Sequence, residues 1–64
     1  MGDREVGTVE SRSGRLYRVK WNDWGEVYVQ EVSGGIVGAW DGPSGKADSP
    51  QEALDMAENF VSGK

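Results

Sequence analysis

A chain of 64 residues with no cysteine and no histidine is one small domain, residues 1–64, without a disulfide or a thiolate or imidazole metal site to hold it together. The missing histidine also removes the commonest general base, so we expect no enzymatic activity, no cofactor and no metal. The net charge of −4 disfavours general attraction to a polyanion.

The sequence predicts a soluble protein that does not enter a membrane. No stretch approaches the ~20 apolar residues that a membrane span requires. Residues 1–5 are charged and no apolar run follows them, which argues against a secretory signal. Together with the absence of cysteine, these features predict an intracellular, cytoplasmic location.

Two strands are predicted in the first third of the chain. Residues 5–10 are a weak candidate, followed by turn residues at 11–14. Residues 15–22 are clearer, because apolar and basic side chains alternate along them. Alternating side chains point to opposite faces of a sheet, so this strand is predicted to have an aromatic, apolar face and a basic face.

Two more strands are predicted before the helix. Residues 22–25 supply a turn, and residues 26–32 form the next strand, with Val27 and Val29 on one face. After a tight turn of serine and two glycines, residues 36–41 form the last strand. Short turns join all of these strands, which predicts an antiparallel sheet of consecutive hairpins.

The helix has the most complete signal. Ser49 suits the N-cap, Pro50 suits the first helical position, and Glu52 completes a capping box. An apolar stripe at helical spacing follows, so we predict a helix over residues 50–62.

The predicted fold is α+β: a three- to four-stranded antiparallel meander with one C-terminal amphipathic helix packed on one face. The other face would be open to solvent or to a partner. The sequence leaves the strand register undetermined. Much of the core is predicted to come from Trp21, Val27 or Tyr28, Trp40, Leu54, Ala57 and Phe60.

Charge is sorted along the chain. Four basic side chains and no acid lie between residues 11 and 20, although the chain as a whole is acidic. Basic side chains near aromatic rings can contact phosphates and stack on bases. They can also pair with Glu26, Glu31 or the acidic helix and protect an exposed sheet face. The candidate contacts for nucleic acid or a partner are Arg12, Arg15, Arg18, Lys20, Trp24 and Tyr28.

Trp24 stands next to Gly25 in a predicted turn and is the tryptophan expected to be most exposed. An exposed tryptophan would be a binding anchor. Alternatively, it folds over the sheet edge and covers the hairpin.

Other motifs do not predict a site. Residues 42–46 resemble a phosphate-binding loop but lack its first glycine and the hydroxyl residue after Lys46. The carboxylates at Asp41, Asp48, Glu52 and Asp55 are of the type that a helix N-terminus and a hydrated surface favour.

Residues 15–62 resemble two groups of small domains. The sequence Tyr17-Arg18-Val19, the Trp24-Gly25 pair before a strand, and the Ser49-x-x-Glu52 helix start resemble AP2-type and integrase-arm DNA-binding domains. That resemblance implies a sheet that reads the major groove. The helix start also resembles the N-terminal region of HicB-type antitoxins, which implies a basic protein partner.

Taken together, the sequence favours a small non-enzymatic protein-interaction module, with an unidentified protein partner or self-association. It would use the exposed sheet face or the acidic helix, or an open sheet edge. The alternative is a nucleic-acid-binding domain that uses the basic strand over residues 12–20.

Overall fold

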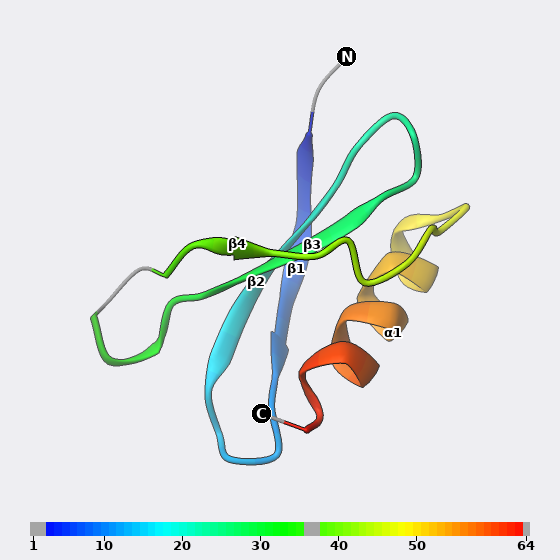
Figure 1. Ribbon diagram of the computed structural model, residues 1–64. Coiled ribbons are helices and arrows are strands. Elements are labelled where there is room, and N and C mark those ends of the chain that lie inside the picture. Colours follow the sequence, from blue (N-terminus) through cyan, green and yellow to red (C-terminus); the bar gives the residue numbers. More distant parts are fainter. Residues whose placement is uncertain (1–2, 36–37, 64) are drawn as a thin grey trace.

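The computed structural model describes residues 3–35 and 38–63, which form one antiparallel sheet and one helix (Figure 1). The sheet is a meander in the order β1-β2-β3-β4, and a short 3-10 helix, Ser33–Gly35, lies between β3 and β4. The α+β prediction is therefore confirmed. The bounds are β1 Arg4–Glu10, β2 Leu16–Trp21, β3 Val27–Glu31, β4 Trp40–Asp41 and α1 Pro50–Val61.

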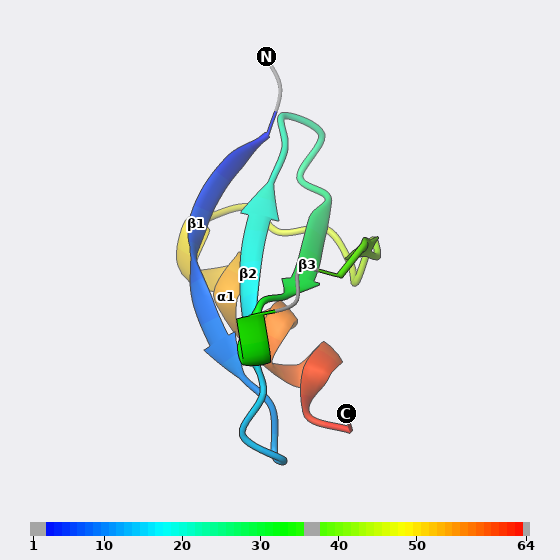
Figure 2. The same cartoon turned by 90° about the vertical axis from the view of Figure 1, so that its left-hand side faces the viewer.

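The helix covers one face of the sheet, as the two views show (Figures 1 and 2). Alternation along β2 gives that face Tyr17 and Val19, and alternation along β3 gives it Val27 and Val29. All four side chains are buried. From the other side they meet the small helical residues of α1, and the buried core as a whole comprises Tyr17, Val19, Val27, Val29, Ala47, Ala53, Ala57 and Val61.

The structure corrects two of the predicted core residues. Trp40 lies opposite Gln30 in the β3–β4 pair, on the face away from the helix, because β4 pairs with β3 in that register. Phe60 is 37% exposed because the buried positions of α1 are Ala53, Ala57 and Val61. Trp21 and Leu54 are partly buried and pack against the core. Between the two alternatives at β3, Val27 is the core residue.

The side of β3 that faces away from β2 forms backbone hydrogen bonds with β4 and with the residues on either side of β4. Predicted as residues 36–41, the last strand is observed only at Trp40–Asp41, and residues 36–37 lie outside the described part of the chain. Gly38 N–H donates to Glu31 O at one end. At the other end, Ser44 N–H donates to Val27 O at 2.8 Å and Val27 N–H donates to Gly45 O at 3.2 Å. The loop at residues 42–46, which resembles a phosphate-binding loop in sequence, therefore pairs with β3 beyond the end of β4.

The predicted capping residues begin the helix, with one change of partner. Ser49 Oγ accepts the backbone N–H of Glu52 at 3.2 Å. The Glu52 carboxylate accepts the backbone N–H of Asp48 at 2.7 Å, one residue earlier than in a standard capping box. Of these two groups, the Glu52 N–H is one that the helix cannot bond internally, and the Asp48 N–H belongs to the residue before the N-cap.

Among residues 3–35 and 38–63, no helix combines the length and apolar character needed to cross a bilayer.

Candidate functional site

Three of the predicted contact residues share the face of the sheet away from the helix. Arg18 and Lys20 alternate with the buried residues of β2, and Tyr28 does so on β3. Gln30 and Trp40 lie on the same side, opposite each other across the β3–β4 pair. We refer to the face formed by Arg18, Lys20, Tyr28, Gln30 and Trp40 as the open face.

Both basic residues of the open face are paired with acids from the β1 side. Arg18 donates to Glu5 twice, from Nε at 3.0 Å and from Nη2 at 2.8 Å. Lys20 Nζ lies 3.0 Å from an oxygen of Asp3. The hydrogen bonds from Arg18 lower the pKa of Glu5, and those same bonds raise the pKa of Arg18. The positive charge on this face is therefore balanced within the molecule.

The Glu5–Arg18 pair predicts a pH-dependent contribution to stability. Because the folded-state pKa of Glu5 is lowered, this contribution is present above the unfolded-state pKa and is lost as the pH falls through the folded-state pKa. The stability deficit of Arg18→Met relative to the wild-type protein should therefore shrink on acidification. Urea unfolding between neutral pH and about pH 3 would measure this. A deficit that stays constant with pH, like that expected for the exposed Arg12→Met, would contradict it.

Trp40 covers the basic residues from the β4 side. Lys20 Nζ lies 4.4 Å from the centre of the Trp40 ring and 5.4 Å from that of Tyr28, and Arg18 Cζ lies 5.7 Å from Trp40. Gln30 is buried beneath this layer, where it accepts from Arg18 at 3.3 Å and donates to Gly38 O at 2.9 Å. The side chains of the open face therefore contact one another across the sheet.

The pKa of Tyr28 is raised, first by its partial burial in this layer and then by the nearby Glu26 carboxylate. The phenol hydroxyl donates to Glu26 at 3.4 Å, so Tyr28 stays protonated as a neutral ring on the open face.

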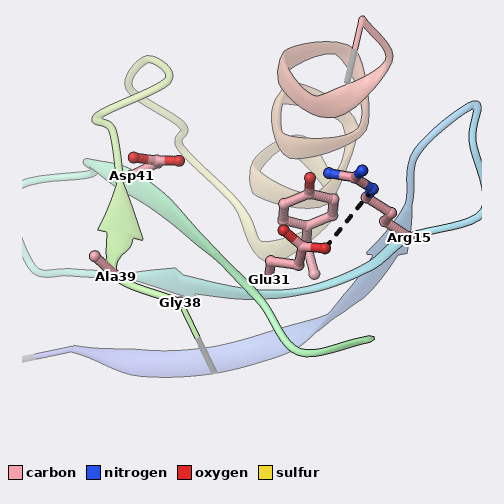
Figure 3. Close-up of a pocket in the computed structure, with 6 residues that line it drawn as sticks. Arg15, Glu31, Gly38, Ala39 and Asp41 are labelled. Atoms are coloured by element: carbon pink, nitrogen blue, oxygen red, sulfur yellow. Dashed lines mark ion pairs between the residues drawn. The ribbon is translucent and has the colours of Figure 1, made fainter. Parts of the chain in front are cut away.

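Arg12 and Arg15 lie away from the open face. Arg12 is exposed in the turn between β1 and β2. Arg15 lines a surface hollow of about 450 Å³ with Tyr17, Glu31 and Asp41 (Figure 3). Its Nε is 3.8 Å from Glu31, and Asp41 stands apart from this pair. The six predicted contact residues are thus distributed over several surfaces instead of one patch.

Trp24 is 72% exposed and lies in the turn between β2 and β3. This turn and the β1–β2 turn are at opposite ends of the sheet (Figure 1). Of the two alternatives for this residue, exposure is the one observed. Asn22 is buried beneath the turn, and its side-chain oxygen accepts the backbone N–H groups of Trp24 at 3.0 Å and Glu26 at 2.9 Å. The backbone that carries the Trp24 ring is therefore fixed by hydrogen bonds.

Gly25 completes this turn. It has a φ of +84°, a left-handed conformation that glycine adopts without strain. A Cβ at this position would lie 3.0 Å from Ala47 O, and the glycine carbonyl accepts the Ala47 N–H at 2.8 Å. The turn is therefore attached to the segment that leads into α1.

A second hollow, of about 340 Å³, lies beside the exposed tryptophan. Trp21 forms part of its wall and donates from Nε1 to Ala47 O at 3.0 Å. Arg4 is 5.6 Å from the centre of the Trp21 ring and 3.0 Å from Asp23. We call this the Trp24 hollow; its lining is Arg4, Trp21, Asn22, Asp23, Trp24, Gly25, Lys46, Ala47 and Asp48.

The sequence indicated Trp24 but not the residues around it. Arg4 and Lys46 come from opposite parts of the chain and meet this turn only through the fold. Within the described part of the chain, no group of three His, Cys, Asp or Glu side chains is placed to hold a metal ion. The side chains of these surfaces form ring contacts and ion pairs.

No family model, no curated protein and no solved structure matches this chain.

Proposed function

We propose that this chain is a small non-enzymatic protein-interaction module that acts in the cytoplasm, with Trp24 as the anchor of its contact surface. The observation that carries this proposal is the exposure of Trp24, which at 72% is the highest among the exposed large apolar side chains of the described residues. Tryptophan is enriched among the residues that dominate binding energy at protein interfaces.

The rigidity of the turn supports the same proposal. An aromatic side chain binds more tightly when little conformational freedom is lost on binding. Asn22 fixes the backbone on both sides of Trp24, and Gly25 ties the turn to Ala47. The Trp24 ring therefore has only its own side-chain rotations to lose when a partner covers it.

Replacement of Trp24 should abolish binding to the partner without unfolding the domain. We expect the immobilised wild-type chain to retain a protein from a cell extract that Trp24→Ser does not retain. Leu16→Ser is the matched control, because Leu16 is 45% exposed on β2, away from the Trp24 turn. Circular dichroism of both variants would verify folding. Retention of the same proteins by Trp24→Ser and by the wild type would contradict the proposal.

A nucleic-acid-binding function is the second candidate. It is favoured by the presence of Arg18, Lys20, Tyr28 and Trp40 on one face, which combines charge with rings for stacking. Two observations oppose it. Glu5 and Asp3 neutralise the cations, and residues 38–63 carry five acidic side chains against one basic.

The two functions differ in their dependence on salt. For nucleic-acid binding, we expect the affinity for labelled single-stranded DNA to fall steeply with salt concentration. The double substitution Arg18→Gln and Lys20→Gln should then weaken binding, whereas Lys46→Gln should have less effect. Fluorescence anisotropy at low and moderate salt measures both. An affinity unchanged in the double variant would exclude the open face as the site.

A further inference from the structure

The Trp24 hollow is an open depression of the surface with a mixed polar and aromatic lining. Its volume of about 340 Å³ is at the lower end of the range for small-molecule sites in proteins. Two indole rings, from Trp21 and Trp24, contribute to the lining. Aromatic rings pair favourably with another ring in offset or edge-to-face geometry, so the hollow suits an incoming aromatic side chain.

The wall of the hollow is already in place. The Trp21 indole is held by its hydrogen bond to Ala47 O, and the Arg4 guanidinium lies over the same ring. Asp23 holds Arg4 in turn, at 3.0 Å. A ligand would therefore meet a preformed surface, with Trp24 as its exposed side.

The charges around the hollow indicate the sign of its ligand. Arg4 pairs with Asp23 at 3.0 Å. Asp48 precedes the N-cap of α1, near the positive end of the helix dipole, where Glu52 also lies. Lys46 is exposed, and in residues 3–35 and 38–63 no carboxylate pairs with it within 4.0 Å. Glu26 lies opposite Lys46 in an isolated antiparallel bridge, but its carboxylate accepts from Asn22 at 3.1 Å and from Tyr28 at 3.4 Å. Lys46 is thus the lining cation that forms no ion pair within the described residues.

We propose that the Trp24 hollow receives a segment of a partner protein in which an aromatic side chain adjoins a carboxylate. The aromatic ring packs against Trp24 and Trp21, and the carboxylate pairs with Lys46. This inference rests on the proposed function, because it names the chemistry of the partner at the same anchor. It also assigns to Lys46 a role in selecting the partner that no feature of its sequence context indicates.

Three matched dipeptides test the proposal: the N-acetylated amides of aspartyl-phenylalanine, asparaginyl-phenylalanine and lysyl-phenylalanine. They share the ring and differ in charge, and the first two have nearly the same shape. Titrations followed by two-dimensional NMR would report on the Trp24 indole N–H and the Lys46 amide. We expect the aspartyl peptide to bind about two- to fivefold more tightly than the asparaginyl peptide, as an exposed ion pair provides.

Lys46→Gln should remove that preference, whereas Arg12→Gln, at the other end of the sheet, should preserve it. The proposal is overturned if the lysyl peptide binds as tightly as the aspartyl peptide. It is also overturned if Lys46→Gln leaves the preference unchanged, or if the Trp24 indole resonance does not shift.

The outcome separates this inference from the proposed function. Partner retention that depends on Trp24, combined with no preference among the dipeptides, would leave the interaction module standing and reject the aromatic-acidic ligand. A clear preference for the aspartyl peptide, with partner retention unaffected by Trp24→Ser, would support the ligand chemistry and reject Trp24 as the anchor of the module.

Discussion

Val19→Ala is expected to lower the free energy of unfolding by about 2–3 kcal/mol, because it removes two buried methyl groups and leaves a cavity. Val19 lies on the central part of β2, has no exposed surface, and belongs to the core between sheet and helix. A domain of this size buries a smaller fraction of its unfolded surface on folding than a larger domain does, so its free energy of unfolding is small. Urea unfolding followed by circular dichroism would measure the loss.

Val32→Ala is the matched control for this prediction. It makes the same chemical change at a half-buried position that does not belong to the core. We expect a loss of about 1 kcal/mol or less. Equal losses in the two variants would show that the helix does not pack on the Val19 face of the sheet.

Trp40→Ala is expected to cost about 2 kcal/mol, made up of two cation–π contacts and the apolar contact of the ring with the sheet. The ring lies over Lys20 and Arg18, and β4 pairs with β3 through only two residues. Loss of the ring should therefore release β4 before the rest of the sheet unfolds. Hydrogen exchange should show faster exchange of the Gly38 amide than in the wild-type protein, because this group donates to Glu31 O.

Trp24→Ala controls for the loss of a tryptophan as such. Trp24 is 72% exposed, and surface substitutions of this kind change stability by about 0.5 kcal/mol at most. Equal destabilisation by the two variants would show that the loss at Trp40 is not specific to its contacts with Lys20 and Arg18. It would also indicate that Trp24 supports the fold and is not available to a partner.

The alternation of side chains along β2 was sufficient to predict its two faces. Tyr17 and Val19 are buried, and Arg18 and Lys20 lie on the opposite side, as expected from a period of two. The same reasoning failed for Trp40, because which face it occupies depends on the pairing of β4 with β3. Hydrophobic character alone cannot determine that register.

The candidate site was only partly predictable for a related reason. The sequence indicated Arg18 and Lys20 but did not connect them with Glu5 and Asp3. Those partners depend on the pairing of β1 with β2, which contains a register shift between Glu5 and Gly7. An irregularity of this kind leaves no signal in the alternation of β1, the weakest of the predicted strands. The exposure of Trp24 was one of two alternatives that its place in a turn left open, and the structure shows it exposed.

The two edges of the sheet differ in a way that limits assembly. The β3 edge is closed by β4 and by the loop containing Ser44 and Gly45, whereas the outer edge of β1 has no strand beside it in the described residues. The other edge strand of the sheet is β4, which spans only Trp40–Asp41, so the longer edge is that of β1. Two copies joined through β1 would each use this edge and form a closed pair. An edge strand as short as β4 offers few backbone groups to a further strand.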